Sequence, residues 1–276
     1  MSSARGTAES MGRRAATALE RLRAERPLVH HITNLVVMND TANVTLLLGA
    51  SPVMAHAAEE VEEMVSLAGA LVLNPGTLER AWIEVMLRAG RRARERSIPV
   101  VLDPVGAGAT TFRTETNRML LERVRPTIVR GNAGEIGALC GAGGAVRGVD
   151  SVGDLPDAVA AARGAARAWA AVVAITGRSD QVSDGTRSYA VDNGHAWLTT
   201  LTGTGCMATT AIAAFAAVEP DGMIAALAGL AAFGLAAERA AGRCSGPGSF
   251  KVALFDELHG LTPEILAAGA RIRGPL

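Results

Sequence analysis

The sequence predicts an α/β protein built on a mostly parallel sheet with an antiparallel edge. Short runs rich in β-branched residues alternate with helical stretches from about residue 28, which is the pattern of successive strand–helix units. Later in the chain, Asp184-Gly185 and Asn193-Gly194 separate short β-like runs and are typical hairpin turns. The chain has 276 residues, 49% hydrophobic and 20% charged, so a single domain spanning residues 1–276 with a substantial core is expected.

The first 26 residues precede the alternating pattern. They hold six Arg and three Glu without an apolar run, so they are expected to form an amphipathic helical extension rather than a signal peptide. Six predicted strands follow, at residues 28–32, 51–54, 70–73, 99–102, 127–130 and 171–175. Several of them end in small or polar residues, and ligands of parallel sheets bind beyond the carboxyl ends of the strands. A binding site is therefore expected along that edge.

The last third of the chain is predicted to contain enclosed helices. Two helices that are apolar on nearly all sides follow Gly205 and are separated at residues 219–222, and a last amphipathic helix is expected from about Phe250. Residues 141–153 are the loosest segment and are expected to form a surface loop. The longest run without polar side chains, residues 223–237, has 15 residues, which suits a buried helix better than a membrane span.

Charge and cysteine content restrict the partners. The 27 basic and 27 acidic side chains give a net charge of zero, which indicates neither a nucleic-acid partner nor an anionic membrane. The three cysteines are widely spaced and form no Cys-x-x-Cys pair, so a reducing cytoplasmic location is expected. Lys251 is the single lysine, which excludes P-loop nucleotide binding, the protein-kinase fold and pyridoxal phosphate chemistry. Backbone amides, Arg and a metal would have to bind any phosphate.

Glycines at the start of the first late apolar helix are the most informative candidates for chemistry. Gly203 and Gly205 flank Thr204, where unpaired first-turn amides can bind a phosphate or an oxyanion. A glycine turn that serves only close helix packing explains the same pattern equally well. Cys206 follows, and the helix dipole is expected to lower its pKa. It could act as a weak base, contact a substrate hydroxyl, or be a small buried hydrophobe.

Two strand ends carry groups suited to a metal and a nucleotide. Asp103 ends an apolar strand and is a candidate Mg²⁺ ligand, directly or through water. Asn132 and Glu135 have the spacing of a helix capping box, which is the better explanation for these two residues alone. Arg130 beside them favours a nucleotide phosphate and its metal.

Neutral polar residues lie near the start of the alternating pattern. His30 and His31 face opposite sides of one predicted strand, which argues against a metal pair. Asn34 follows and could hold a small uncharged ligand through its amide, although caps and turns explain such residues as well. Met54 lies at the end of the second predicted strand, and on its own it is expected to pack in the core rather than to contact a substrate.

Together these segments resemble the hydroxyethylthiazole kinase family of thiamine biosynthesis. The similarity covers nearly everything after residue 27. Its blocks are residues 30–34 (HHITN), 49–55 (GASPVMA), 74–77 (NPGT), 103–109 (DPVGAGA), 130–132 (RGN), 176–177 (TG) and 203–206 (GTGC). The resemblance implies a ribokinase-like three-layer α/β/α fold. It also implies Mg²⁺-dependent transfer of the ATP γ-phosphate to the primary alcohol of 4-methyl-5-(2-hydroxyethyl)thiazole.

The resemblance assigns roles by matching position. Residues expected to contact ATP are Arg130, Thr176 and Asn132, and those expected near hydrated Mg²⁺ are Asp103 and Glu135. The expected thiazole contacts are Met54, Asn34, Gly76 and Gly203. The expected catalytic anion hole comprises Gly203, Thr204, Gly205 and Cys206. Cys206 stands where most members of the wider superfamily carry an aspartate base. Members of the family are typically trimers, so a homotrimer is expected.

Other proteins with this fold remain alternatives. A kinase for hydroxymethylpyrimidine or pyridoxal is the closest one, although such enzymes usually keep the aspartate that is absent here. An ADP-dependent dehydratase that repairs hydrated nicotinamide nucleotides and a catalytically idle binder are the others. ATP consumption that depends on the thiazole alcohol would separate all four.

Overall fold

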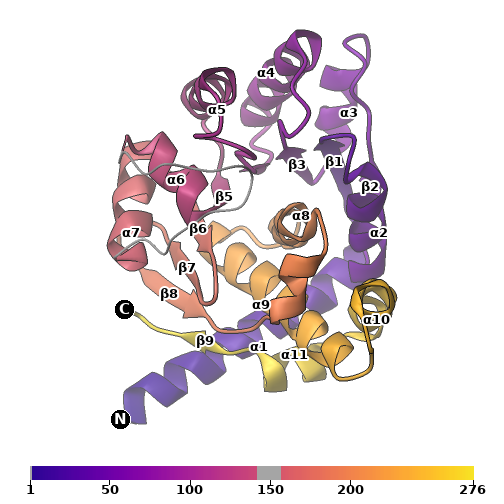
Figure 1. Cartoon of the computed structure of the whole chain (residues 1–276), viewed down its shortest axis with the longest axis vertical. Helices are drawn as coiled ribbons and strands as arrows, with labels where there is room; N and C mark the ends of the chain where they lie inside the picture. Colours follow the sequence, from indigo (N-terminus) through magenta and orange to yellow (C-terminus); the bar gives the residue numbers. More distant parts are fainter. Residues whose placement is uncertain (1, 142–156) are drawn as a thin grey trace.

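One nine-stranded sheet forms the centre of the molecule, with helices on both of its faces (Figure 1). The computed structural model describes residues 2–141 and 157–276. Across these residues the strand order is β2-β1-β3-β4-β5-β6-β7-β8-β9. The strands are β1 (Leu28–Ile32), β2 (Ser51–Val53), β3 (Ala70–Leu73), β4 (Val100–Leu102), β5 (Ile128–Asn132), β6 (Val172–Thr176), β7 (Asp180–Ser183), β8 (Ser188–Val191) and β9 (Ile272–Arg273).

Strands β1 to β6 are parallel to one another, as the alternating pattern predicts. Leu71 of β3 pairs with Val100 of β4, and Val129 of β5 pairs with Val173 of β6. These strands are apolar because helices bury them from both sides. All six predicted parallel strands are present, and their carboxyl ends share one edge of the sheet.

The antiparallel edge consists of β7, β8 and β9. The predicted turn at Asp184-Gly185 is confirmed, since it joins β7 to β8. The predicted hairpin turn at Asn193-Gly194 is wrong, because β8 ends at Val191 and pairs with β9 from the carboxyl terminus. Asn193 Oδ1 accepts a hydrogen bond from the backbone N–H of Arg271 at 2.7 Å. Asn193 therefore links the end of β8 to the carboxyl-terminal segment at Arg271 and does not form a hairpin turn.

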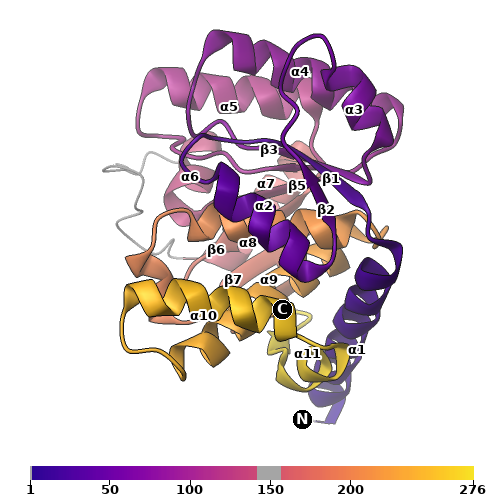
Figure 2. The same cartoon turned by 90° about the vertical axis from the view of Figure 1, so that its right-hand side faces the viewer.

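The helices form one layer on each face of the sheet (Figure 2). One layer contains α3 (Val61–Leu67), α4 (Arg80–Glu95), α5 (Thr111–Val124), α6 (Ala133–Leu139) and α7 (Ala158–Trp169). The other contains α2 (Met38–Leu48), α8 (Thr204–Ala216) and α9 (Gly222–Ala241). Packed against this second layer are α1 (Ser2–Glu25), α10 (Pro247–Gly260) and α11 (Pro263–Gly269). A 3₁₀ helix, η1 (Ala196–Thr200), precedes α8.

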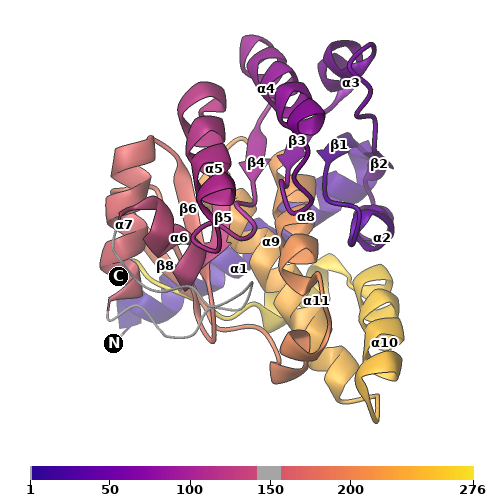
Figure 3. The ribbon, with the colours of Figure 1, turned by 45° about the horizontal axis from the view of Figure 1, so that its top comes forward.

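The two predicted apolar helices are α8 and α9, and nearly all of their side chains are buried. Helix α8 is seen almost end-on in Figure 1 and along its length in Figure 3. By length and composition alone, α9 could cross a membrane, but 89% of its apolar window is buried inside the protein. Burial against neighbouring helices therefore explains its composition.

The two ends of the chain meet the second helical layer. The predicted amino-terminal helix is confirmed, and α1 buries Leu19 and Leu22 in the core that it shares with α9 and α11. The helix predicted from about Phe250 is present as α10, which begins at Pro247, and a further short helix, α11, follows it. Thr262 caps α11 by accepting a hydrogen bond from Ile265 N at 3.3 Å. The loop predicted at residues 141–153 falls, from residue 142 onward, outside the described residues.

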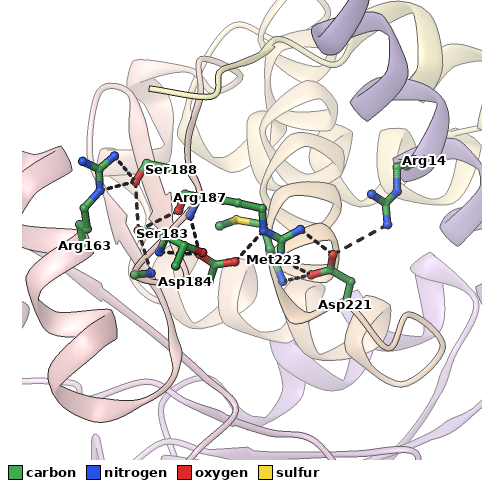
Figure 4. Close-up of polar contacts among 10 residues, drawn as sticks. Arg14, Arg163, Ser183, Asp184, Arg187, Ser188, Asp221 and Met223 are labelled. Carbon is green, nitrogen blue, oxygen red and sulfur yellow. Dashed lines mark hydrogen bonds and ion pairs between the residues drawn. The ribbon is translucent and has the colours of Figure 1, made fainter.

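An ionic cluster joins the β7–β8 hairpin to the start of α9 (Figure 4). Arg187 donates to the two carboxylate oxygens of Asp221 at 2.8 and 3.0 Å and to Asp184 Oδ2 at 2.6 Å. Asp221 caps α9 by accepting from Met223 N at 3.0 Å, and Arg14 of α1 lies 3.8 Å from its Oδ2. Because the hairpin turn lies near the start of β6, this cluster is at the edge opposite the carboxyl ends of the parallel strands.

Candidate active site

Polar side chains gather where the parallel strands end. Asn34 follows β1, Asn74 follows β3, Asp103 follows β4, and Arg130 and Thr176 lie in the last part of β5 and β6. The first turn of α8 approaches the same place. A Cβ added at Gly205 would lie 2.6 Å from Nη1 of Arg130.

The Asp103 carboxylate is the centre of this group and is fully buried. Its Oδ2 accepts hydrogen bonds from Thr209 Oγ1 at 2.8 Å and from Asn74 Nδ2 at 3.2 Å. Arg130 Nη1 lies 3.7 Å from the same oxygen. The other oxygen, Oδ1, is buried without a hydrogen-bond partner among residues 2–141 and 157–276. Burial raises the pKa of Asp103, while Arg130 opposes that shift.

Two asparagine amides link Asp103 to Cys206, and backbone N–H groups fix their orientation. Asn74 Oδ1 accepts from Gly76 N at 3.1 Å and from Asn34 Nδ2 at 2.9 Å, so Asn74 Nδ2 must face Asp103. Asn34 Oδ1 accepts from Val36 N at 3.0 Å, so its Nδ2 is the donor to Cys206 Sγ at 3.8 Å. The thiol therefore accepts a hydrogen bond from this network.

The Cys206 thiol is buried, and the predicted lowering of its pKa is wrong. Burial and the neighbouring Asp103 carboxylate raise the pKa of Cys206 to about 12. The helix dipole favours the thiolate, but its effect on the pKa is small. The loss of water around a buried thiolate and the repulsion by a neighbouring carboxylate raise the pKa by more. Cys206 is therefore a protonated thiol at neutral pH.

The amino-terminal turn of α8 has the geometry of an anion site. Gly203 caps the helix with φ 82°, a left-handed conformation that favours glycine, and an added Cβ would lie 2.4 Å from Val37 Cγ1. The first helical bond runs from Met207 N to Gly203 O at 2.9 Å, so the three preceding amides lie ahead of the helical ladder. Thr204 contributes its amide only, since its hydroxyl donates to Leu198 O of η1 at 2.8 Å.

Arg130 and Thr176 form the next part of the site. Arg130 Nη2 donates to Thr176 Oγ1, which lies 3.4 Å from Gly131 O. The Arg130 side chain is only 11% exposed, and its Nε is buried with no hydrogen-bond partner in the described part of the chain. This arrangement leaves a largely desolvated cation beside the amides of α8, where an anion would be strongly bound.

Asn132 and Glu135 form a complete capping box at the start of α6. Asn132 Oδ1 accepts from Glu135 N, and Glu135 Oε2 accepts from Asn132 N, both at 2.9 Å. Glu135 Oε1 also accepts from Gly106 N at 2.9 Å. Burial, followed by the charge of Asp103, raises the pKa of Glu135 to about 7. The cap predicted from the sequence thus exists, and it carries a buried carboxylate near Asp103.

Two predicted thiazole contacts differ in their position. Gly76 lies inside the network, and an added Cβ would lie 2.6 Å from Asn34 Nδ2, so glycine is needed there. Met54 follows β2, the edge strand beyond β1, and is partly buried. The residue after Met54, Ala55, is hydrogen-bonded through its carbonyl oxygen to His30 Nε2 at 2.5 Å. Met54 is thus at the same edge of the sheet but outside the hydrogen-bonded network.

Residues 19–264 match the family model described as the hydroxyethylthiazole kinase family. The chain belongs to the hydroxyethylthiazole kinase family. The hydroxyethylthiazole kinase of Roseiflexus sp. (strain RS-1) is 63% identical over 264 residues, which cover 96% of this chain and 98% of that protein. That of Desulforudis audaxviator (strain MP104C) is 62% identical over 259 residues, which cover 94% and 95%. Members of the family are kinases, so the chain is a phosphotransferase.

Solved structures agree with this assignment. The structure of a hydroxyethylthiazole kinase protein from Pyrococcus horikoshii OT3 has a TM-score of 0.86 and 46% identity, and the match covers 94% of this chain and 98% of that one. A ribokinase-like superfamily protein from Enterococcus faecalis V583, 12% identical with a TM-score of 0.60, shows the fold alone. The predicted ribokinase-like α/β/α fold is therefore confirmed.

Sequence reasoning missed three residues of this kinase's site. Asn74 was visible as a polar strand end and in one block of the resemblance, but it was given no role, and it joins Asn34 to Asp103. Thr209 follows Gly205 by four residues, so helical spacing alone could have placed it on the same face of α8. Arg113 of α5 donates to Gly76 O at 3.0 Å, a contact between a helix and a distant loop for which the sequence contains no local signal.

Proposed function

We propose that this kinase transfers the γ-phosphate of ATP to the hydroxyl group of 4-methyl-5-(2-hydroxyethyl)thiazole, with Mg²⁺ as the cofactor. The observation that carries the proposal is the pairing of the first-turn amides of α8, which lie ahead of the first helical hydrogen bond, with the nearly buried Arg130. This pairing provides a phosphate site without lysine, in a chain whose single lysine, Lys251, pairs with Asp40 elsewhere.

The nucleotide is proposed to lie over β5 and β6. Arg130 and Thr176 would contact its phosphates, with Asn132 beside them at the start of α6. The amides of Thr204, Gly205 and Cys206 would hold the phosphoryl group as the alcohol oxygen attacks it and the bond to ADP breaks. Such a transition state is loose, so positioning and charge neutralisation supply most of the rate.

Asp103 and Glu135 are proposed to hold Mg²⁺, and the residues fit that role. Asp103 Oδ1 is buried and unpaired, and each Glu135 oxygen accepts one backbone amide and keeps a second lone pair for a metal-bound water. The described residues contain no cluster of three such ligands, so phosphate oxygens and water would complete the coordination. Bound there, Mg²⁺ supplies neutralisation of the phosphate charge.

The thiazole alcohol is proposed to lie against Cys206, Asn34 and Gly203, with Gly76 and Met54 lining its ring. Because the pKa of Cys206 is raised to about 12, the thiol is assigned to positioning the hydroxyl, not to removing its proton. A protonated thiol that already accepts from Asn34 can still donate or accept one further weak hydrogen bond.

The surroundings of the site support a homotrimer with sites between subunits. Leu35 and Val36, 62% and 68% exposed, directly follow Asn34, and Leu46 of α2 is 54% exposed. Large exposed apolar side chains beside a site are typical of a surface that a subunit covers. We propose a cytoplasmic location on the basis of three free cysteines, Cys140, Cys206 and Cys244.

A phosphorylation assay over a panel of alcohols tests the function. The purified protein is incubated with ATP and Mg²⁺ and with hydroxyethylthiazole, hydroxymethylpyrimidine or pyridoxal, and ADP is measured. We expect ADP only with the thiazole alcohol. Turnover of the pyrimidine or pyridoxal instead, or dehydration of a hydrated nicotinamide nucleotide in the presence of ADP, would replace the proposed function.

A further inference from the structure

Thr209 lies in the second turn of α8, and its hydroxyl contacts the Asp103 carboxylate. We propose that Thr209 is a positioning residue that locks the orientation of Asp103 and so keeps Oδ1 turned toward the proposed metal. The inference rests on the proposed function and extends it to a residue outside the glycine motif.

Thr209 donates this hydrogen bond to the ionised Asp103 carboxylate. Thr209 Oγ1 lies 2.8 Å from Asp103 Oδ2 and 3.3 Å from Gly205 O. A hydroxyl has one proton to donate, and the shorter contact is to the charged acceptor. Thr209 therefore donates its proton to the hydrogen bond with the carboxylate and not to the one with Gly205 O. Both side chains are 0% exposed, and no bulk water is available to replace this bond.

The bond joins two parts of the site that must keep a fixed separation. Asp103 is fixed to the end of β4, whereas the first-turn amides belong to α8. Thr209 lies one helical turn after Gly205, so its bond to Asp103 fixes the carboxylate relative to the proposed phosphate-binding turn. Phosphoryl transfer requires the metal ligand and the phosphate-binding turn to keep a fixed distance and orientation.

The remaining partners of Asp103 cannot supply the same restraint. Asn74 Nδ2 donates to the same Oδ2 from 3.2 Å, and Arg130 Nη1 is 3.7 Å away without a hydrogen bond. Without Thr209, the carboxylate is free to rotate toward Arg130. That rotation would remove Oδ1 from the metal and occupy the cation proposed for phosphate.

Three variants test the proposal. Thr209→Val removes the hydroxyl at nearly constant volume, and Thr209→Ser restores it. Thr210→Val is the matched control, because Thr210 is equally buried in the same helix but donates to Cys206 O at 3.0 Å instead of to Asp103. Thermal melting of all four proteins accompanies the kinetic and binding measurements.

We expect Thr209→Val to lower kcat about 10- to 100-fold, the usual effect of losing a residue that orients a metal ligand, with a smaller change in the KM for the alcohol. Calorimetry should show that Mg²⁺ increases ADP affinity about tenfold less in Thr209→Val than in wild type. A crystal structure of metal-free Thr209→Val should show Asp103 turned toward Arg130. Thr209→Ser should recover most of both properties, and Thr210→Val should keep them.

Equal loss in Thr209→Val and Thr210→Val, or an unchanged effect of Mg²⁺ on ADP affinity in Thr209→Val, would overturn the proposal and reduce Thr209 to packing. Failure of the proposed function would give a different result from failure of the proposed role of Thr209. In that case wild type does not phosphorylate the thiazole alcohol, while the ADP affinities and the Asp103 orientation still decide the role of Thr209.

Discussion

The Cys206 thiol lies beside the buried Asp103 carboxylate, whose charge opposes ionisation of the thiol. Burial raises the pKa of both groups, and the carboxylate charge helps raise the pKa of Cys206 to about 12. A thiolate beside this carboxylate would be both desolvated and repelled. Cys206 is thus held protonated at neutral pH.

Cys206→Ala should lower kcat more than it weakens ATP binding, because the thiol contacts the proposed acceptor hydroxyl and not the nucleotide. The pH–rate profile between pH 6 and 9 should keep its shape, since the Cys206 thiol does not ionise in that range. Alkylation by iodoacetamide, followed by mass spectrometry, should modify exposed Cys140 on the order of 100-fold faster than Cys206. Rapid labelling of Cys206 at neutral pH would contradict a protonated thiol.

Gly205→Ala should abolish most turnover while the protein remains folded. The added Cβ would lie 2.6 Å from Arg130 Nη1, so the guanidinium must move away from the amides of α8. We expect a loss in kcat of about 100-fold or more, as for the removal of an oxyanion donor. Gly164→Ala is the control, because the space around this glycine of α7 is open and alanine should stabilise the helix by about 1 kcal/mol. Equal activity of the two variants would argue against a phosphate site at Gly205.

Local sequence signals predicted the parts of the fold that rest on local physics. The β-branched strands and the all-apolar helices α8 and α9 need burial from every side, which composition reveals directly. Asn193-Gly194 has the composition of a hairpin turn, but a partner 78 positions away, Arg271, determines its structure. Strand β9 has two residues, too few for any periodicity.

In the candidate site, too, local features could be predicted from the sequence and features that depend on tertiary contacts could not. The capping box of Asn132 and Glu135 is a local pattern, and it is present as predicted. The pKa of Cys206 was misjudged because the helix terminus is visible in the sequence, whereas burial and the Asp103 charge come from the tertiary structure. Thr209 was missed because a buried threonine in an apolar helix, like the adjacent Thr210, looks like packing until its partner Asp103 after β4 is known.

Asp180 should make the stability of the protein depend on pH. Burial raises the pKa of Asp180, which accepts from Gly177 N at 3.0 Å, from 3.8 to about 7, with Arg130 lowering and Asp192 raising it. A raised carboxyl pKa contributes stability below pH 3.8, and this contribution is lost as pH rises through about 7. The free energy of unfolding should therefore fall by at most about 1.4 kcal/mol per pH unit across this window.

Asp180→Asn should remove that pH dependence, because asparagine keeps the acceptor for Gly177 N and carries no charge. Urea unfolding at pH 5 and pH 8 measures the difference for both proteins. The decrease from pH 5 to pH 8 should be smaller in the variant, and Asp180→Asn should be the more stable protein at pH 8. Parallel pH dependences in the two proteins would show that Asp180 titrates at its ordinary pKa.

Asp221 stabilises the fold through two separable interactions (Figure 4). Its Oδ1 caps α9 through Met223 N at 3.0 Å, and both oxygens bind Arg187. Asp221→Asn keeps the cap and removes the charge, so it should cost about 0.5–1 kcal/mol, and added salt should diminish the difference. Asp221→Ala should cost about 1 kcal/mol more, because the cap is lost as well.

Asp157→Ala is the matched control for the cap alone. Asp157 caps α7 by accepting from Ala160 N at 2.8 Å and is exposed. Its replacement should cost about 1 kcal/mol, measured by urea unfolding, and its salt dependence is limited to the interaction of the Asp157 charge with the helix dipole. If Asp221→Asn is as destabilising as Asp221→Ala, then the pair with Arg187 dominates and the cap contributes little. In either case turnover should be unchanged, because this cluster lies at the edge of the sheet opposite Asp103.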